Sequence, residues 1–425
     1  MSPRRPICLI TTLTLATAGC FDIAVPAGSL RCVDRCPDGM ECIGGLCYPE
    51  GWMPGADAAL DVPGLDADAA PPDRSLPGET TADIDPSWPY PGWGFRKTIV
   101  IDKSMFKGSD TDFPVVISRS ADPDLAAHAQ AGGADLLFTL PDHQKLAHEI
   151  ERCEAGTLVA WVKLPSYAEG ADAVLLMYYG NKNAAPQEQP TQVWTNGYEA
   201  VWHMDADPTG QVPDSTGRHP GTSRGSMTAA DLVDGQLGKG IDFDGSDDAL
   251  DVGSFDVTGS GSDGGICLEA WVYSRSGKGR VISKATGIQD ADHVWMLAVG
   301  ASDQNWYSAD FRVRTSSVSW LVAPGALQGK TWTFVAGNFS GTKQRIYLNG
   351  SIPAEKSLQG TVAADPAVAV SIGDNPVGAR PFDGVLDEVR VSRVSRPASW
   401  LHTQQRNHSD PDAYIKVGAE EPRPY

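Results

Sequence analysis

Residues 381–397, PFDGVLDEVRVSRVSRP, decide the fold, because apolar and polar residues alternate in this stretch as they do in a half-buried β-strand. On a regular strand, odd-numbered side chains share one face and even-numbered ones the other. The odd face carries Val385, Asp387, Val389 and Val391, and the even face carries Leu386, Glu388, Arg390 and Ser392. Asp387 and Glu388 would therefore point in opposite directions, which argues against a catalytic pair. Asp387 would be buried and would need a cation or several hydrogen-bond donors.

The chain around this stretch has the same character. Short runs rich in Val, Ile and Trp are divided by turns, and the 425 residues include 45 Gly and 31 Pro. Asn349–Gly350 predicts a two-residue type I′ hairpin, and Asp122 predicts the cap of a short helix that starts at Pro123. We therefore predict an all-β fold of two β-sandwich modules, with Trp271 and Trp332 in the core of the second.

Charge and missing motifs narrow the function. The formal net charge is -20, and a nucleic-acid partner would require a basic face that this composition does not offer. The sequence contains no HExxH or GxxxxGK[ST] motif. Whether the chain is an enzyme stays open, and we favour a binding protein.

The first residues predict export and a membrane anchor. Arg4 and Arg5 precede an apolar run and the small residues of TAGC, residues 17–20, as in a secretory signal. TAGC resembles the bacterial lipobox, which implies a lipoprotein signal peptide over residues 1–19 and lipid on Cys20. The alternative is ordinary signal cleavage that leaves Cys20 as a free thiol.

Further cysteines and a biased segment follow. Residues 20–48 contain four closely spaced cysteines, which in an exported chain predict a small knot of two disulfides: Cys32, Cys36, Cys42 and Cys47. Their pairing stays open among three possibilities, and zinc is the rival interpretation. Residues 49–90 are rich in Pro, Ala and Asp, which predicts a disordered linker. Cys153 and Cys267 lie in apolar runs, and we expect buried thiols there.

Two family resemblances cover the rest. Residues 91–196 resemble the bacterial domain of unknown function 2341 through an ordered set of motifs: WGFRK (93–97), DFPV (112–115), EIE (149–151), AWVK (160–163) and YYGN (178–181). Residues 197–420 resemble the laminin-G-like, concanavalin A-like jelly roll, again through ordered motifs: AVWHMD (200–205), LGKGIDFDGSDDALDV (237–252), ICLEAWVY (266–273) and GVLDEVRVS (384–392). The second resemblance implies recognition of a glycan or another extracellular polymer.

The jelly-roll resemblance also implies candidate sites. Many members hold a structural calcium ion, and Asp214, Asp248 and Asp387 are the candidate ligands, because calcium prefers carboxylate oxygens. Each has an alternative role, respectively as a turn residue, a solvated loop residue and a buried hydrogen-bonded acid. Asn305, Trp306 and Tyr307 are the candidate glycan-binding residues, although alternation would place one of the two aromatic rings in the core.

A hydrolase is the main alternative to a binding protein. Glu149, Glu151 and Glu154 nearly reproduce the Glu-x-Asp-x-x-Glu pattern of family 16 glycoside hydrolases, in which two carboxyls flank one glycosidic bond. We favour a solvated polar strand face for these residues and a structural role for His203. The sequence thus predicts a lipid-anchored binding or adhesion protein of the bacterial cell envelope, at the outer membrane or cell surface. A hydrolase and a purely structural envelope protein remain the alternatives.

Overall fold

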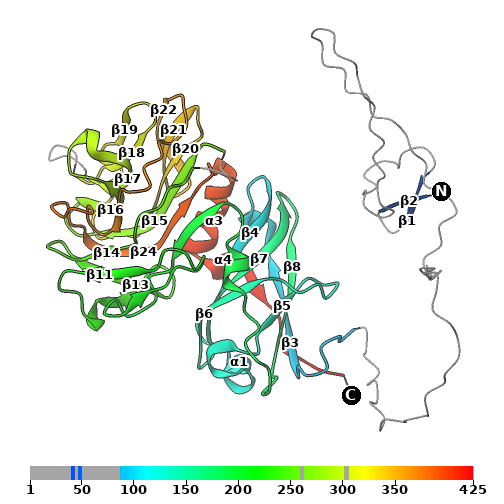
Figure 1. Cartoon of the computed structure of the whole chain (residues 1–425). Coiled ribbons are helices and arrows are strands. Elements are labelled where there is room, and N and C mark those ends of the chain that lie inside the picture. Colours follow the sequence, from blue (N-terminus) through cyan, green and yellow to red (C-terminus); the bar gives the residue numbers. More distant parts are fainter. Residues whose placement is uncertain (1–39, 44–45, 50–86, 259–262, 301–305, 425) are drawn as a thin grey trace, which may run out of the picture. The chain divides into compact units, whose positions relative to one another are not determined.

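The computed structural model describes residues 40–43, 46–49, 87–258, 263–300 and 306–424 of the chain (Figure 1). The chain divides into two units, Met1–Thr80 and Thr81–Tyr425. In the first unit, β1 (Met40–Ile43) and β2 (Leu46–Pro49) form a hairpin whose backbone register pairs Cys42 with Cys47. The predicted signal peptide, Cys20, Cys32, Cys36 and residues 50–86 of the predicted linker lie outside the described residues. No helix in the described part of the chain is long and apolar enough to cross a membrane.

The second unit begins with a small β-sandwich. One sheet has the order β25–β3–β8–β5, with β26 also paired to β3, and the other has the order β4–β7–β6. Their bounds are β3 (Phe95–Ile101), β4 (Ser109–Arg119), β5 (Leu137–Thr139), β6 (His148–Glu154), β7 (Thr157–Ala168), β8 (Ala173–Tyr179), β25 (Ile415–Val417) and β26 (Glu421–Pro422). Alternating apolar side chains fill the space between the sheets, among them Ile99, Ile117 and Leu175.

The larger part of this unit is a jelly roll of two sheets. The first has the order β10 (Gln211–Val212), β11 (Gly221–Arg224), β14 (Ala249–Asp251), β23 (Val370–Ile372), β16 (Gly279–Ala285), β17 (His293–Val299), β18 (Ala309–Arg314) and β19 (Val318–Ala323). The second has the order β12 (Leu232–Asp234), β13 (Lys239–Asp244), β24 (Asp383–Ser392), β15 (Ile266–Ser274), β20 (Thr333–Phe339), β21 (Lys343–Leu348) and β22 (Ser351–Ser357), and β9 (Tyr198–Trp202) also pairs with β24. The predicted all-β class is confirmed.

Two local predictions are also confirmed. Asn349 and Gly350 connect β21 and β22 with φ angles of 47° and 79°, which are the positive values that a type I′ hairpin requires. Asp122 caps α1 (Pro123–His128) by accepting hydrogen bonds from the backbone N–H groups of Asp124 and Leu125. Short helical segments make up the remaining elements: α2 (Pro190–Val193), α3 (Ala398–Ser409), α4 (Pro411–Tyr414), η1 (Lys103–Met105), η2 (Ala131–Gly133), η3 (Ala229–Asp231) and η4 (Asp290–Asp292).

The end of the chain returns to the first sandwich. Figure 1 shows α3 beside β4, and the Asn407 side chain bonds both polar groups of the Val116 backbone, at 2.8 Å to N and 3.0 Å to O. The amide thus satisfies hydrogen bonds at the open edge of the β4–β7–β6 sheet. Beyond α4, β25 and β26 pair with β3. The last residues therefore complete the sandwich that the first described residues of this unit begin.

The two sandwiches share one apolar core at a junction. The apolar cluster of the first sandwich continues into the outer face of the jelly-roll sheet, through Trp271 of β15 and Phe334 of β20, and into α3 through Trp400. Trp332 is partly buried against the same cluster. The expectation that Trp271 and Trp332 lie in the jelly-roll core is therefore corrected. Both pack at the junction, because β15 alternates its side chains between two buried faces.

A β-bulge in β24 changes which side chains of residues 381–397 share a face of the sheet. Glu269 pairs with Arg390 and Trp271 pairs with Asp387, so Glu388 and Val389 together oppose the single residue Ala270. Glu388 adopts a φ angle of 52°. Side chains on both sides of the bulge then face the jelly-roll core: Leu386, Val389 and Val391. The prediction that Asp387 shares a face with Val389 is wrong, because the extra residue shifts the alternation.

Candidate functional site

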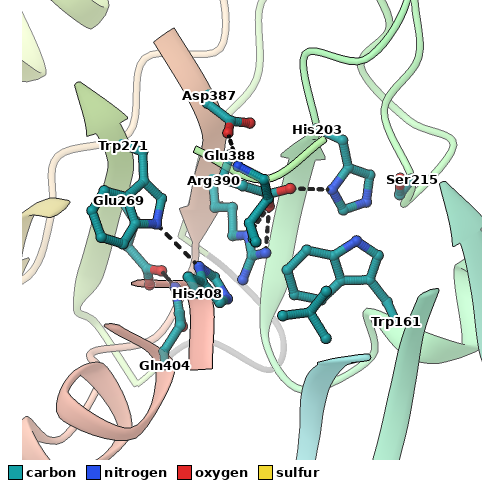
Figure 2. Close-up of polar contacts among 12 residues, drawn as sticks. Trp161, His203, Ser215, Glu269, Trp271, Asp387, Glu388, Arg390, Gln404 and His408 are labelled. Carbon is teal, nitrogen blue, oxygen red and sulfur yellow. Dashed lines mark hydrogen bonds and ion pairs between the residues drawn. The ribbon is translucent and has the colours of Figure 1, made fainter. Parts of the chain in front are cut away.

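Glu388 forms the centre of a buried charged network at the junction (Figure 2). The His203 ring, just after β9, lies with Nδ1 2.7 Å from Glu388 Oε1. The other oxygen of Glu388 accepts hydrogen bonds from Arg390, including one of 3.1 Å from Nε. The Arg390 guanidinium also stacks over Trp161 and Trp194, 4.6 Å and 4.8 Å from the ring centroids. The bulge thus places one acid between two cations.

Glu149 and Glu151 of β6 enter the same network. Glu149 accepts hydrogen bonds of 2.6 Å from both Trp194 Nε1 and Ser215 Oγ, and lies 3.4 Å from His203 Nε2. Glu151 accepts a 3.1 Å bond from Trp161 Nε1. The expected solvated face is therefore wrong for these two acids, because the jelly roll covers β6 there, while Glu154 is 76% exposed.

The network sets the ionisation of its members. Burial alone would raise the pKa of Glu388, but His203 and Arg390 lower it below the usual value. Burial would lower the pKa of His203, but Glu388 and Glu149 raise it well above the usual value. His203 is therefore an imidazolium within a charge-assisted hydrogen-bond chain, and the arrangement is a salt-bridge network with a structural role.

Two further buried acids, Glu151 and Asp387, are not fully balanced by nearby cations. Burial, together with the nearby Glu388 and Asp205, raises the pKa of Glu151 to about 8 against the opposing effect of His203. Burial and the nearby Glu388 raise the pKa of Asp387 well above the usual value. Asp387 accepts a 2.8 Å bond from Leu237 N with Oδ2, and its Oδ1 atom has no hydrogen-bond partner. Protons on these acids limit the negative charge at the junction.

Figure 2 also shows a polar layer between α3 and β15. Trp271 Nε1 donates to His408 Nδ1 at 3.3 Å, and Gln404 donates to Glu269. Burial lowers the pKa of His408 well below the usual value, so its ring is neutral. These contacts fix α3 on the jelly-roll sheet.

The three calcium candidates lie in different surroundings. Asp214 accepts bonds from the backbone N–H groups of Val201, Thr216, Arg218 and His219, which leaves no free carboxylate lone pair directed to a metal. Asp387 lies at the junction described above. The described residues include two groups of three ligating side chains whose atoms lie within 4.8 Å of one another: Glu151–His203–Glu388 and Asp244–Asp247–Asp248. Neither group unites Asp214, Asp248 and Asp387.

The oxygens available to a cation differ between these two groups. In the first, His203 and Arg390 already neutralise Glu388, so a further cation does not fit well. In the second, Asp248 is 3% exposed, with Oδ2 accepting from Asp244 N at 3.0 Å and Oδ1 accepting no hydrogen bond. A calcium ion fits the free oxygen of Asp248 together with Asp244 and Asp247.

The predicted aromatic pair separates, but not by strand alternation, because both residues lie in a turn in which Tyr307 has a φ angle of 56°. Trp306 is 50% exposed, whereas Tyr307 packs against the jelly-roll core. Tyr307 N donates to Gly277 O at 2.9 Å and its hydroxyl donates to Arg275 O at 3.0 Å, which holds Trp306 beside the 277–278 turn. Lys278 Nζ lies 5.1 Å from the centroid of the Trp306 ring. Asn305 lies outside the described residues.

A cleft of about 200 Å³ lies next to Lys278. Charged and polar side chains from β13, β16 and the loops around them line it: Asp244, Ser276, Lys278, Arg280, Arg380 and Asp383. Arg280 and Arg380 belong to no sequence motif and were not predicted as site residues. The one sign in the sequence was an arginine next to the apolar residues of RVIS (280–283), where a buried strand would normally have an apolar residue. A broader depression of about 900 Å³ beside Thr258 and Thr361 has no aromatic or basic residue in its lining.

Models of known protein families match two parts of the chain. Residues 244–402 match the concanavalin A-like lectin/glucanases superfamily. The fold of this part of the chain is a concanavalin A-like jelly roll. Residues 132–210 match the domain of unknown function 2341. The predicted order of the two families is confirmed, and Trp306 and Arg280 both belong to the concanavalin A-like domain.

Two solved structures align with about half of the chain. Domain 4 of a GH43 extracellular arabinanase from Geobacillus stearothermophilus, in complex with arabinotriose, is 17% identical with a TM-score of 0.37, and the match covers 48% of this chain and 96% of that one. The receptor-binding domain of a botulinum neurotoxin C/D mosaic serotype is 10% identical with a TM-score of 0.37, and the match covers 49% of this chain and 51% of that one. No curated protein matches the chain by sequence.

Proposed function

We propose that the concanavalin A-like domain binds carbohydrate, with the ring of Trp306 packing on a sugar and the adjacent cleft supplying hydrogen bonds. The observation that carries this proposal is the half-exposed indole of Trp306, held beside Lys278 at a polar cleft. Ligand sites commonly combine an exposed aromatic surface with a few fixed polar groups. The family match of this domain to lectins and glucanases supports the same class of ligand.

A glycan array probed with the full chain tests the proposal. We expect Trp306→Ala to lower the affinity for the recognised glycan at least tenfold without changing the unfolding midpoint, because the ring is half exposed. Ile352→Ala is the matched control, since Ile352 is 45% exposed on β22 and does not line the cleft. Unchanged glycan binding by Trp306→Ala would refute this site.

We propose further that the protein acts as a binding or adhesion protein at the bacterial cell envelope, anchored by lipid on Cys20. The motif TAGC at residues 17–20 supports this proposal. A labelled fatty acid should enter the wild-type chain but not Cys20→Ser, and only the wild type should sediment with membranes. Equal labelling of both chains would contradict the assignment.

A calcium ion at Asp244, Asp247 and Asp248 is a proposal of its own, supported by the unpartnered buried oxygen of Asp248. We expect millimolar calcium to raise the unfolding midpoint of the full chain and EDTA to reverse the change. Asp248→Asn should remove the response, and Asp234→Asn, which changes an exposed acid on β12, should keep it. A response that survives in Asp248→Asn would place the ion elsewhere.

A glycoside hydrolase is the second candidate function. The observation in its favour is that Glu151, whose pKa is raised to about 8, lines a cleft of about 280 Å³ together with Glu154 and Asp205. Against it, Trp161 binds one oxygen of Glu151, and the backbone of Gly238 closes on the other. Turnover of a bound glycan that is lost in Glu151→Gln, with binding retained, would favour the hydrolase.

A further inference from the structure

Arg280 is a buried cation without a partner. Its residue exposure is 1%, its guanidinium forms no hydrogen bond or ion pair with the described residues, and Nε is buried with no acceptor. Buried charges in proteins are usually paired, because an uncompensated one is costly. Burial, followed by the nearby Arg312 and Arg380, lowers the pKa of Arg280 to about 9. The Arg280 side chain therefore contributes no ion pair with the described residues to the stability of the fold.

The acids near Arg280 are bound to other groups. Asp383 forms a 2.7 Å ion pair with Arg275. Asp374 accepts bonds from the backbone N–H groups of Asn375 and Arg380. Two more acids near this end of the domain are occupied in the same way: Asp310 accepts from Ser308 and Trp320, and Asp244 accepts from the Ser246 and Asp247 backbone. The described residues therefore offer Arg280 no free acid, and a bound anion would supply one.

The backbone holds Arg280 firmly at the cleft. Gly279 has a φ angle of 127°, and a Cβ there would lie 2.4 Å from Phe382 Cα, so β16 and the 380–382 loop approach more closely than another residue would allow. Arg280 N donates to Arg380 O at 3.1 Å. The two arginines are thus tied together on adjacent segments, and both line the cleft.

Other donors converge on the same space. The hydroxyl of Ser276 is buried with no hydrogen-bond partner. Lys278 and Arg380 are exposed and form no ion pair with the described residues. Three cations and a free hydroxyl therefore meet, beside Asp244 and Asp383, in a cleft of about 200 Å³, which is below the roughly 300–1,000 Å³ of sites for larger ligands and suits a single sugar unit.

We propose that this cleft binds the acidic group of an anionic saccharide, with Arg280 and Ser276 holding a carboxylate or sulfate and Lys278 and Arg380 flanking it. Trp306 then packs on the ring of the same or the next sugar. This inference rests on the proposed carbohydrate binding and names its ligand class. Guanidinium groups suit both anions, because their N–H donors form paired bonds to planar or tetrahedral oxygens.

Binding of a trigalacturonate by the full chain, measured by calorimetry, tests the inference against the methyl-esterified trisaccharide, which differs only in charge. We expect the acid to bind at least tenfold more tightly than the ester, with a preference that shrinks as salt is added. Arg280→Gln should remove the preference by weakening the binding of the acid. Arg345→Gln, which changes an arginine paired with Glu355 outside the cleft, is the control and should keep the preference.

The outcomes separate this inference from the proposed function. Equal affinity for the acid, the ester and a sulfated trisaccharide would overturn the anion site and leave carbohydrate binding intact, whereas no binding of any sugar on the glycan array would overturn both. A second arm of the experiment uses a trisaccharide that carries sulfate groups and no carboxylate. Tight binding of this trisaccharide alone would assign sulfate as the anion. Should Arg280→Gln fail to fold by circular dichroism, Arg380→Ala decides, because this exposed residue should still lower the preference for the acid about threefold.

Discussion

Arg390 and Arg280 are both buried arginines, with exposures of 0% and 1%, yet their surroundings differ. Arg390 binds Glu388 and stacks on two tryptophans, and its pKa is raised because Glu388 and Tyr198 outweigh the effect of burial. Arg280 has no such partner, and its pKa is lowered. Stability explains the first arginine and cannot explain the second. The comparison teaches that the pairing of a buried charge, rather than its burial, separates structural from ligand-binding positions.

The largest expected effect comes from removing the acid that pairs Arg390. Glu388→Gln leaves Arg390 without its acid and His203 with Glu149 as its remaining close partner, which should lower the free energy of unfolding by about 3–5 kcal/mol. Denaturant unfolding of the full chain measures this. Glu355→Gln removes an exposed acid that also pairs with an arginine, and it should change stability little. Similar effects of the two substitutions would mean that the junction network does not stabilise the fold.

The dependence of the free energy of unfolding on pH tests the ionisation of the acids at the junction. Glu151 titrates at about 8 in the folded chain against a usual value of 4.5, so the folded state holds the extra proton between these limits. Stability should therefore fall as pH rises through this window, with a slope of up to about 1.4 kcal/mol per pH unit from this group. His203 adds loss in the same direction as pH rises through its raised folded pKa.

Glu151→Gln keeps the shape of the side chain and removes its titration. We expect the variant to lose most of the slope between about pH 4.5 and 8 and to gain stability relative to the wild type as pH rises. Chemical denaturation at several pH values measures the slope. Glu154→Gln, which changes the exposed acid of the same strand, should keep the wild-type profile.

The smallest expected effect tests the comparison directly. Arg280→Met removes an unpaired buried charge, so the free energy of unfolding should stay within about 1 kcal/mol of the wild type or increase. Arg390→Met, in contrast, should destabilise the chain by several times that amount, because Glu388 loses a partner. A severe loss of stability in Arg280→Met would show that Arg280 supports the fold and would break the comparison.

Features that depend on neighbouring residues could be predicted from the sequence, whereas packing between distant segments of the chain could not. The Asn349–Gly350 hairpin and the Asp122 cap depend on neighbouring residues, and the structure has both. The bulge at Glu388 depends on β15 opposite, and the burial of Glu149 depends on the jelly roll that covers β6. A single sequence does not reveal which distant strand covers a polar face, so these acids looked solvated.

The unpartnered donors of Arg280 and Ser276 were beyond sequence reasoning for a related reason. An unpaired atom is recognised only when every neighbour is known, and those neighbours come from residues 244, 310, 374 and 383, far apart along the chain. The family resemblance predicted that the domain binds sugars, but it carried no residue of this cleft.

The pairing of β25 and β26 with β3 has a consequence for the timing of folding. About 320 residues separate these strands along the chain, so the first sandwich stays incomplete until the last residues have been synthesised. Contacts of such long sequence separation form slowly, because closing a large loop costs entropy before the contacts stabilise it. A chain that emerges from the ribosome therefore exposes the hydrogen-bonding edge of β3 throughout synthesis, and it should need a holding chaperone until residues 415–422 arrive.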